Sequence, residues 1–168
     1  KEMIVFSKPS SAITDRLASF KEEPLHYEGE ICFLIKDGAY AAVGFGLDIT
    51  KRALQSKLRD QGLPWERAKA FDGAALFSRF VTVPRSLNDL SLRLDVNENT
   101  RQCGGVELMI YKPETILQEL SSFLTLNDGD IVMTGTPKGV GQVNTNDFFC
   151  GTIFNGEQLL VSGSWRAS

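Results

Sequence analysis

Two glutamates open an apolar stretch of the chain, in the segment HYEGEICFLI at residues 26–35. Because side chains alternate across a β-strand, Glu28 and Glu30 would point to the same face. Neighbouring carboxylates repel each other, and a shared cation is a common reason for a protein to keep them together. A solvated strand end is the plainer interpretation of such a pair, but the apolar residues that follow at once place it near buried structure.

A third acid, Asp48, ends the next apolar stretch, and the Asp-Gly pair at 37–38 predicts a hairpin that brings the two stretches side by side. Three convergent carboxylates, with no sulfur and little nitrogen nearby, form an all-oxygen site. Such a site suits Mg²⁺ or Mn²⁺, with Ca²⁺ as an alternative. Three protein ligands would leave coordination positions for water or substrate, as in catalytic metal sites.

A helix is predicted directly after Asp48, over residues 50–62. Arg52 and Gln55 are three positions apart and share one face of it, so both would stand near the carboxylates. A solvated helix face is the alternative interpretation. Further along, Lys69 lies in the small, apolar stretch AKAFDGAA. It is either a surface lysine or a charge aimed into an open site, and in the second case removing the charge should hardly affect stability.

A glycine-rich segment, GDIVMTGTPKGVG at residues 129–141, combines a predicted strand with a rigid turn. Exposed backbone N–H groups of this turn, with the hydroxyl of Thr134 or Thr136, could hold an oxyanion. The segment lacks the Gly-Lys-Ser/Thr ending of a nucleotide-binding P-loop. A plain tight turn is the alternative interpretation.

The composition narrows the class of protein. The chain has 168 residues, is 42% hydrophobic and carries a net charge of −3, which suits a single domain over residues 1–168. It has no basic footprint for nucleic acid, and no apolar run approaches the roughly 20 residues that span a membrane. Three scattered cysteines indicate free thiols and a reducing compartment, the cytoplasm: Cys32, Cys103 and Cys150. Cys32 shares the strand face of the acidic pair and is expected to be buried beneath it.

The expected elements are mostly strands. Strands are predicted at 3–7, 27–36, 39–49, 91–96 and 128–135, and a hairpin with an Asn-Gly turn at 148–165. Two or three helices are predicted at 50–62, 64–71 and 113–124, the first with Thr50 as N-cap and Gly62 as its end. Because helices do not alternate regularly with the strands, a doubly wound α/β sheet is not indicated.

Taken in order, five segments resemble the fumarylacetoacetate hydrolase family, in particular its small acylpyruvate hydrolase branch, which also includes oxaloacetate decarboxylases. They are KPSSAI (8–13), HYEGE (26–30), GFGLDITKRALQ (44–55), GLPWERAKAF (62–71) and GDIVMTGTPKGVG (129–141). Single segments are weak signals, but the ordered set is specific and covers nearly the whole chain.

The resemblance implies a mostly β fold of rolled, mixed β-sheets and a homodimer. It implies Mg²⁺ or Mn²⁺ bound by Glu28, Glu30 and Asp48. It places four residues around the 2-oxo-carboxylate of a small anionic substrate, the first three also as catalytic residues: Lys69, Arg52, Gln55 and Thr136. His26 matches a histidine that stands behind the metal ligands rather than among them.

Members of the family also carry an upstream His and Glu, on a short helix that closes over the site and activates water. We expect this lid, and with it the general base, to precede Lys1 in the native protein; a catalytically impaired relative is the alternative. The resulting hypothesis is a metal-dependent hydrolase that cleaves C–C bonds of acylpyruvates through an enolate. The alternatives are an isomerase or decarboxylase in aromatic catabolism, of the oxaloacetate or 2-hydroxyhepta-2,4-diene-1,7-dioate type, and a non-catalytic metal-binding homologue.

Overall fold

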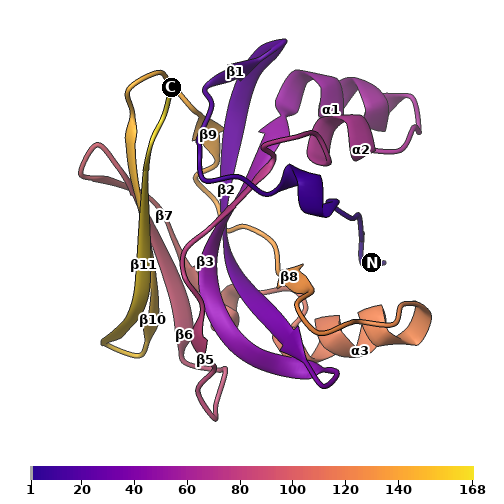
Figure 1. Ribbon diagram of the computed structural model, residues 1–168, viewed down its shortest axis with the longest axis vertical. Coiled ribbons are helices and arrows are strands. Elements are labelled where there is room, and N and C mark those ends of the chain that lie inside the picture. The colour runs from indigo at the N-terminus through magenta and orange to yellow at the C-terminus, as the bar shows by residue number, and fades with distance from the viewer. Residues whose placement is uncertain (1) are drawn as a thin grey trace.

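Two β-sheets packed face to face make up most of the computed structural model, in which residues 2–168 are described (Figure 1). The first sheet contains β1 (Phe20–Lys21), β2 (Glu23–Lys36), β3 (Ala39–Lys51), β4 (Ala75–Phe77), β5 (Val81–Thr82), β8 (Ile131–Met133) and β9 (Gly141–Gln142). The second contains β6 (Leu90–Val96), β7 (Asn99–Gly105), β10 (Phe148–Asn155) and β11 (Gln158–Arg166). The predicted mostly β fold is therefore confirmed.

A long hairpin of β2 and β3 forms the centre of the first sheet. The predicted turn lies between the two strands, and both of its residues adopt a left-handed backbone conformation, with φ of 51° at Asp37 and 71° at Gly38. A type I′ turn needs this geometry at both central residues, which explains the Asp-Gly pair. The resulting register places Glu28 directly opposite Asp48. A β-bulge close to the turn shifts the pairing by one residue between Ile35–Tyr40 and Leu34–Ala42, so the turn and the bulge together decide which side chains of the two strands meet.

The second sheet runs in the order β11-β10-β6-β7, and the ladders between its strands are antiparallel. The predicted hairpin is confirmed, but its turn lies one residue later than the Asn-Gly pair: Asn155 ends β10 and pairs with Gln158, and the turn residues are Gly156, with φ of 57°, and Glu157. The inner face of this sheet packs on the hairpin of the first sheet. Aromatic contacts mark the interface: Tyr27 meets Phe149 edge to face at 5.2 Å between ring centroids.

Three α-helices and two short 3-10 helices flank the sheets: α1 (Arg52–Asp60), α2 (Glu66–Lys69), α3 (Pro113–Phe123), η1 (Ser10–Ala12) and η2 (Val106–Leu108). Ile116 and Leu120 of α3 form a second small core with Ile35 and Val132. Among the described residues, no helix is long and apolar enough to cross a bilayer. In Figure 1 the α1–α2 pair and α3 lie on the face of the first sheet that points away from the second sheet.

The strand predicted at residues 3–7 is wrong. These residues form neither a strand nor a helix, and Phe6 packs on Trp65 beside α2, at 6.0 Å between ring centroids. An apolar, β-branched segment forms a strand only where the fold offers a ladder to join.

The predicted N-cap of the first helix is also wrong. Helix α1 begins at Arg52, and the side chain of Lys51 in the cap position makes no capping hydrogen bond. The Glu23 carboxylate accepts from the N–H groups of Ala53 and Leu54 instead, and the Thr50 hydroxyl accepts from Lys69. At the other end the prediction holds, because Gly62 follows the helix with φ of 65°.

The predictions of free thiols and of a buried Cys32 are confirmed. All three thiols are free, and Cys32 is fully buried on the strand that carries the acidic pair. Its thiol lies so close to Gly46 of β3 that a β-carbon there would sit 2.5 Å from the sulfur. The layer beneath the carboxylates is therefore tightly packed.

Close approach of the two sheets makes Gly151 of β10 a sensitive position. A β-carbon at this residue would overlap the buried ring of Phe45 on β3. We expect Gly151→Ala to lower the free energy of unfolding by about 1–3 kcal/mol, since neither sheet can move without disturbing the whole interface. Thermal unfolding measures the effect, with Ser162→Ala on the exposed face of β11 as control. An unchanged melting temperature would contradict this account of the interface.

Candidate metal centre

Three carboxylates from the β2–β3 hairpin converge on one point of the outer face of the first sheet. One oxygen from each of Glu28, Glu30 and Asp48 lies within 4.8 Å of the other two. Their exposed fractions are only 8%, 4% and 2%. The convergence that the sequence predicted is therefore confirmed, and its cause is the hairpin register, which sets Asp48 opposite Glu28 while Glu30 follows on the same face.

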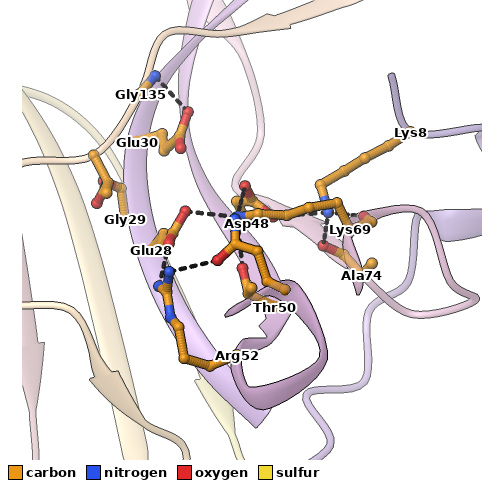
Figure 2. A network of polar contacts seen from close by, with 12 residues as sticks. Lys8, Glu28, Gly29, Glu30, Asp48, Thr50, Arg52, Lys69, Ala74 and Gly135 are labelled. Carbon is orange, nitrogen blue, oxygen red and sulfur yellow. Dashed lines mark hydrogen bonds and ion pairs between the residues drawn. The ribbon is translucent and has the colours of Figure 1, made fainter. Parts of the chain in front are cut away.

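Lys69 lies between two of the three carboxylates, Glu28 and Asp48 (Figure 2). Its ammonium group donates to Glu28 Oε2 at 2.8 Å, to Asp48 Oδ2 at 2.7 Å and to Thr50 Oγ1 at 2.6 Å. Helix α2 ends at this residue, and the side chain is only 1% exposed. Of the two interpretations that the sequence left open, the surface lysine is excluded. The charge points inward, although into a closed network rather than an open site.

Lys8 is a second buried cation, and sequence reasoning missed it. Its ammonium group lies 2.7 Å from Asp48 Oδ1 and donates to the carbonyl of Ala74 at 2.9 Å and to that of Lys69. It comes from the N-terminal segment, far from the hairpin in sequence. The only signal was its place in KPSSAI, which carried part of the family resemblance without suggesting a role.

Arg52 and Gln55 occupy the first turns of α1 at the edge of the cluster. The Arg52 guanidinium donates to Glu28 Oε1 and, at 2.7 Å, to Gln55 Oε1. Both side chains are half-buried. The predicted shared helix face thus does bring these two residues to the carboxylates, and their partial exposure leaves them within reach of a small molecule.

Glu30 differs from the other two carboxylates because no lysine or arginine among residues 2–168 forms an ion pair with it. It accepts a hydrogen bond from the backbone N–H of Gly135 at 2.7 Å. Complete burial, together with the nearby charges of Asp48 and Glu28, raises the pKa of Glu30 to about 8. This carboxyl group is therefore the one that holds a proton at neutral pH when no divalent cation is bound.

The environment also shifts the pKa values of its neighbours. Burial raises the pKa of Asp48 even though Lys8 and Lys69 oppose this. At Glu28 burial acts in the same direction, but Lys69 and Arg52 outweigh it and hold the pKa below its ordinary value. Burial lowers the pKa of Lys8, with the charge of Asp48 opposing. The pKa of Glu28 is lowered while those of Glu30 and Asp48 are raised, because the balance of nearby charges differs among these buried groups.

Thr136 and His26 lie around the cluster without touching its carboxylates. The Thr136 hydroxyl donates to the carbonyl of Gly29, between the two glutamates of β2, at 2.9 Å. His26 shares the strand face of those glutamates, and burial followed by the charge of Arg52 lowers its pKa. Two further residues were not found from sequence: Phe6, whose ring centroid is 5.3 Å from Lys69 Nζ, and Gln102, which holds Thr136.

The three carboxylates fit a small divalent cation. They supply oxygen donors only, and Asp48 Oδ1 is buried without a hydrogen bond, in contact with the Lys8 ammonium. Oxygens bound to Mg²⁺ at about 2.0–2.1 Å lie roughly 3–4 Å from one another, so the present spacing needs only small side-chain adjustments. Hard, anionic oxygens favour Mg²⁺ or Mn²⁺ over the metals that prefer sulfur or imidazole.

Known proteins resemble this chain in both sequence and fold. Residues 1–164 match the family model of the fumarylacetoacetate (FAA) hydrolase C-terminal region. Oxaloacetate tautomerase YcgM of Escherichia coli (strain K12) is 35% identical over 96% of this chain and 81% of its own length. Bovine (Bos taurus) mitochondrial oxaloacetate tautomerase FAHD1 is also 35% identical, over 87% of this chain and 74% of its own.

Among solved structures, fumarylpyruvate hydrolase of Pseudomonas aeruginosa, in complex with Mn²⁺ and pyruvate, superposes with a TM-score of 0.84 at 28% identity. The superposition covers 96% of this chain and 77% of that protein. Fold and sequence thus define a β-rich domain of metabolic enzymes. The chain belongs to the fumarylacetoacetate hydrolase family, and its named relatives are enzymes, as the sequence predicted.

Metal binding should depend on pH because of Glu30. Its pKa of about 8 means that a proton must leave before the carboxylate can bind a cation. We expect Mn²⁺ affinity to rise about tenfold per pH unit between pH 6 and 8 and to level off above, with release of about one proton per ion at pH 6.5. Calorimetry in buffers of different ionisation enthalpy measures both quantities. A constant affinity from pH 6 to 9 would refute this role for Glu30.

The burial of Lys69 revises the expectation that its charge hardly matters for stability. Lys69→Met leaves two buried carboxylates without their shared partner, although Arg52 and Lys8 remain. We expect a loss of about 3 kcal/mol in EDTA, the lower end for a broken buried pair, and partial recovery with Mn²⁺. Thermal unfolding with and without Mn²⁺ tests this, with Lys57→Met on exposed α1 surface as control. Equal melting temperatures of variant and wild type in EDTA would contradict it.

Proposed function

We propose that this protein is a divalent-metal-dependent enzyme of small 2-oxo dicarboxylic acids, and that keto–enol tautomerisation of oxaloacetate is its activity. The observation that carries the proposal is the charge balance of the cluster. Three cations, Lys8, Arg52 and Lys69, already match the three carboxylates. A bound divalent cation therefore leaves an excess of two positive charges, which a dicarboxylate dianion neutralises.

The chemistry follows from the same arrangement. A bound Mg²⁺ or Mn²⁺ would be held by Glu28, Glu30 and Asp48, and would supply positive charge against the enolate oxygen of the substrate. Arg52 and Gln55, at the partly exposed edge, would orient a substrate carboxylate through their N–H donors. Lys69 donates to Glu28, Asp48 and Thr50, so its ammonium would hold two of the metal-binding carboxylates in place and add a fixed positive charge close to the site, where negative charge develops.

Tautomerisation makes fewer demands on the site than hydrolysis does. It needs an enolate and a route for one proton, whereas C–C hydrolysis also needs an activated water molecule that attacks the acyl carbon. Two relatives at 35% identity are oxaloacetate tautomerases by name, which supports the same choice. Acylpyruvate hydrolysis is the second candidate, supported by the similarity to a fumarylpyruvate hydrolase that holds Mn²⁺ and pyruvate.

One set of assays separates these candidates. Purified protein with Mn²⁺ or Mg²⁺ is given oxaloacetate, and the ultraviolet absorbance of the enol reports tautomerisation while pyruvate formation reports decarboxylation. Acylpyruvate and fumarylpyruvate are tested for loss of the diketo absorbance. Metal-dependent enol conversion, faster than the other reactions, is the expected result. Hydrolysis without tautomerisation would replace the first proposal by the second, and inactivity on every 2-oxo acid would reject both.

Arg52 should act on the substrate more than on the fold. A charge-assisted bond to a carboxylate is worth about 1.5–3 kcal/mol, so Arg52→Ala should lower kcat/KM for oxaloacetate roughly ten- to hundred-fold. Arg59→Ala is the matched control, since this arginine lies on the same helix but is exposed and paired only with Asp60. A variant at position 52 that turns over oxaloacetate as fast as the control would exclude Arg52 from substrate binding.

A further inference from the structure

We infer that Gln102 of β7 is a positioning residue, which fixes Thr136 and the glycine-rich loop against the strand that carries Glu28 and Glu30. The inference rests on the proposed function for its catalytic meaning. Gln102 belongs to the second sheet, yet its side chain is only 1% exposed and reaches the first. It makes hydrogen bonds to three different residues, and none of them is a carboxylate.

A gap in the first sheet explains why this side chain is needed. Strand β2 pairs with β9 at residues 26–27 and with β8 at residues 32–34, and the loop between β8 and β9 leaves the sheet opposite the acidic pair. Within this gap Gly29 donates its N–H to Gln102 Oε1 at 2.8 Å and accepts from the Thr136 hydroxyl at 2.9 Å. Two side chains thus replace the strand that is missing beside the glutamates.

The hydrogen bonds fix the orientation of the Gln102 amide. The N–H of Gly29 can only donate, so Oε1 must face it, and the carbonyl of Pro137 can only accept, so Nε2 must face that carbonyl at 2.8 Å. The same Nε2 donates to Thr136 Oγ1, also at 2.8 Å. Thr136 Oγ1 therefore accepts a hydrogen bond from Gln102, and the hydroxyl proton remains free to be donated. It is donated to the carbonyl of Gly29 in this structure, and could turn to a substrate oxygen when one is bound.

The space around Gly29 supports the same conclusion. A β-carbon at this position would lie 2.9 Å from the Phe45 ring and 3.1 Å from Gln102 Oε1. Glycine between the two glutamates thus allows the amide to approach the strand closely. The loop is also close to β7 beyond Gln102, because a β-carbon at Gly104 would lie 2.9 Å from Pro137. Gln102 is the polar part of a contact that sets the loop on the metal strand.

The test compares Gln102→Met, Thr136→Val and the double variant with wild type. Oxalate is the probe, and its Kd on Mn²⁺-loaded protein is measured by calorimetry. We expect each single variant to raise the Kd for oxalate about tenfold. The double variant should bind oxalate no more weakly than the worse single variant, because both changes break the same Gln102–Thr136 contact. Mn²⁺ affinity should stay within about threefold, since neither residue contacts a carboxylate. Gln118→Met on the exposed face of α3 and Ile153→Val in the core of the second sheet are the controls.

Amide hydrogen exchange gives a readout that needs neither metal nor substrate. In Gln102→Met the N–H of Gly29 should exchange at least tenfold faster, while that of Ile35, bonded to the carbonyl of Asp130 at 2.8 Å, should not change. If Gln102→Met fails to fold, Gln102→Glu decides, because it keeps an acceptor for Gly29 but cannot donate to Pro137. In this variant the N–H of Gly29 should still exchange slowly, and the affinity for oxalate should still fall.

The inference is overturned by unchanged exchange of the Gly29 N–H in Gln102→Met, by oxalate affinity within twofold of wild type in both Gln102 variants, or by a double variant in which the losses of affinity of the two single variants multiply. A general loosening of the fold would weaken Mn²⁺ and oxalate together and would also overturn it. Failure of wild type to bind oxalate counts against the proposed function instead, and Gly29 exchange then decides on Gln102 alone.

Discussion

Burial of three negative charges on one hairpin is the constraint on which the rest of the structure depends. A carboxylate that leaves water without a partner loses several kcal/mol of solvation, so each must be paired, hydrogen-bonded or protonated. Glu28 meets this demand with Lys69 and Arg52, and Asp48 with Lys8 and Lys69. Glu30 has only a backbone N–H, and its raised pKa is the consequence.

The supply of these partners explains the arrangement of the elements around the hairpin. Lys8 comes from the N-terminal segment, Arg52 from the start of α1 and Lys69 from the end of α2, all gathered on one face of the first sheet (Figure 2). The second sheet covers the opposite face and keeps the hairpin rigid through its aromatic core. The charged groups thus have fixed positions before any ligand arrives, which is what electrostatic catalysis needs.

Local signals in the sequence were sufficient for much of the fold. Two Asp-Gly or Asn-Gly turns with alternating strands predicted both main hairpins, and the apolar spacing and proline of 113–124 predicted α3. The strand at 3–7 and the Thr50 cap were wrong for one reason. Residues 3–7 have a high strand propensity and Thr50 has a high N-cap propensity, but tertiary contacts override both. The fold places no strand beside residues 3–7, and the Thr50 hydroxyl accepts a hydrogen bond from Lys69.

The same division holds at the candidate site. The sequence by itself predicted that Glu28 and Glu30 share a strand face and that Arg52 and Gln55 share a helix face, because strand alternation and helix spacing act over short distances. It also predicted that Asp48 joins the glutamates, but the two-residue turn alone would pair Glu28 with Leu47, and only the β-bulge beside Ile35 sets it opposite Asp48. Only the tertiary structure decided that Lys8 and Lys69 neutralise the acids and that Gln102 fills the gap beside Gly29. These contacts join segments that are distant along the chain. The packing of the two sheets and the cost of burying unpaired charge select the partners, and neither can be read from a local sequence pattern.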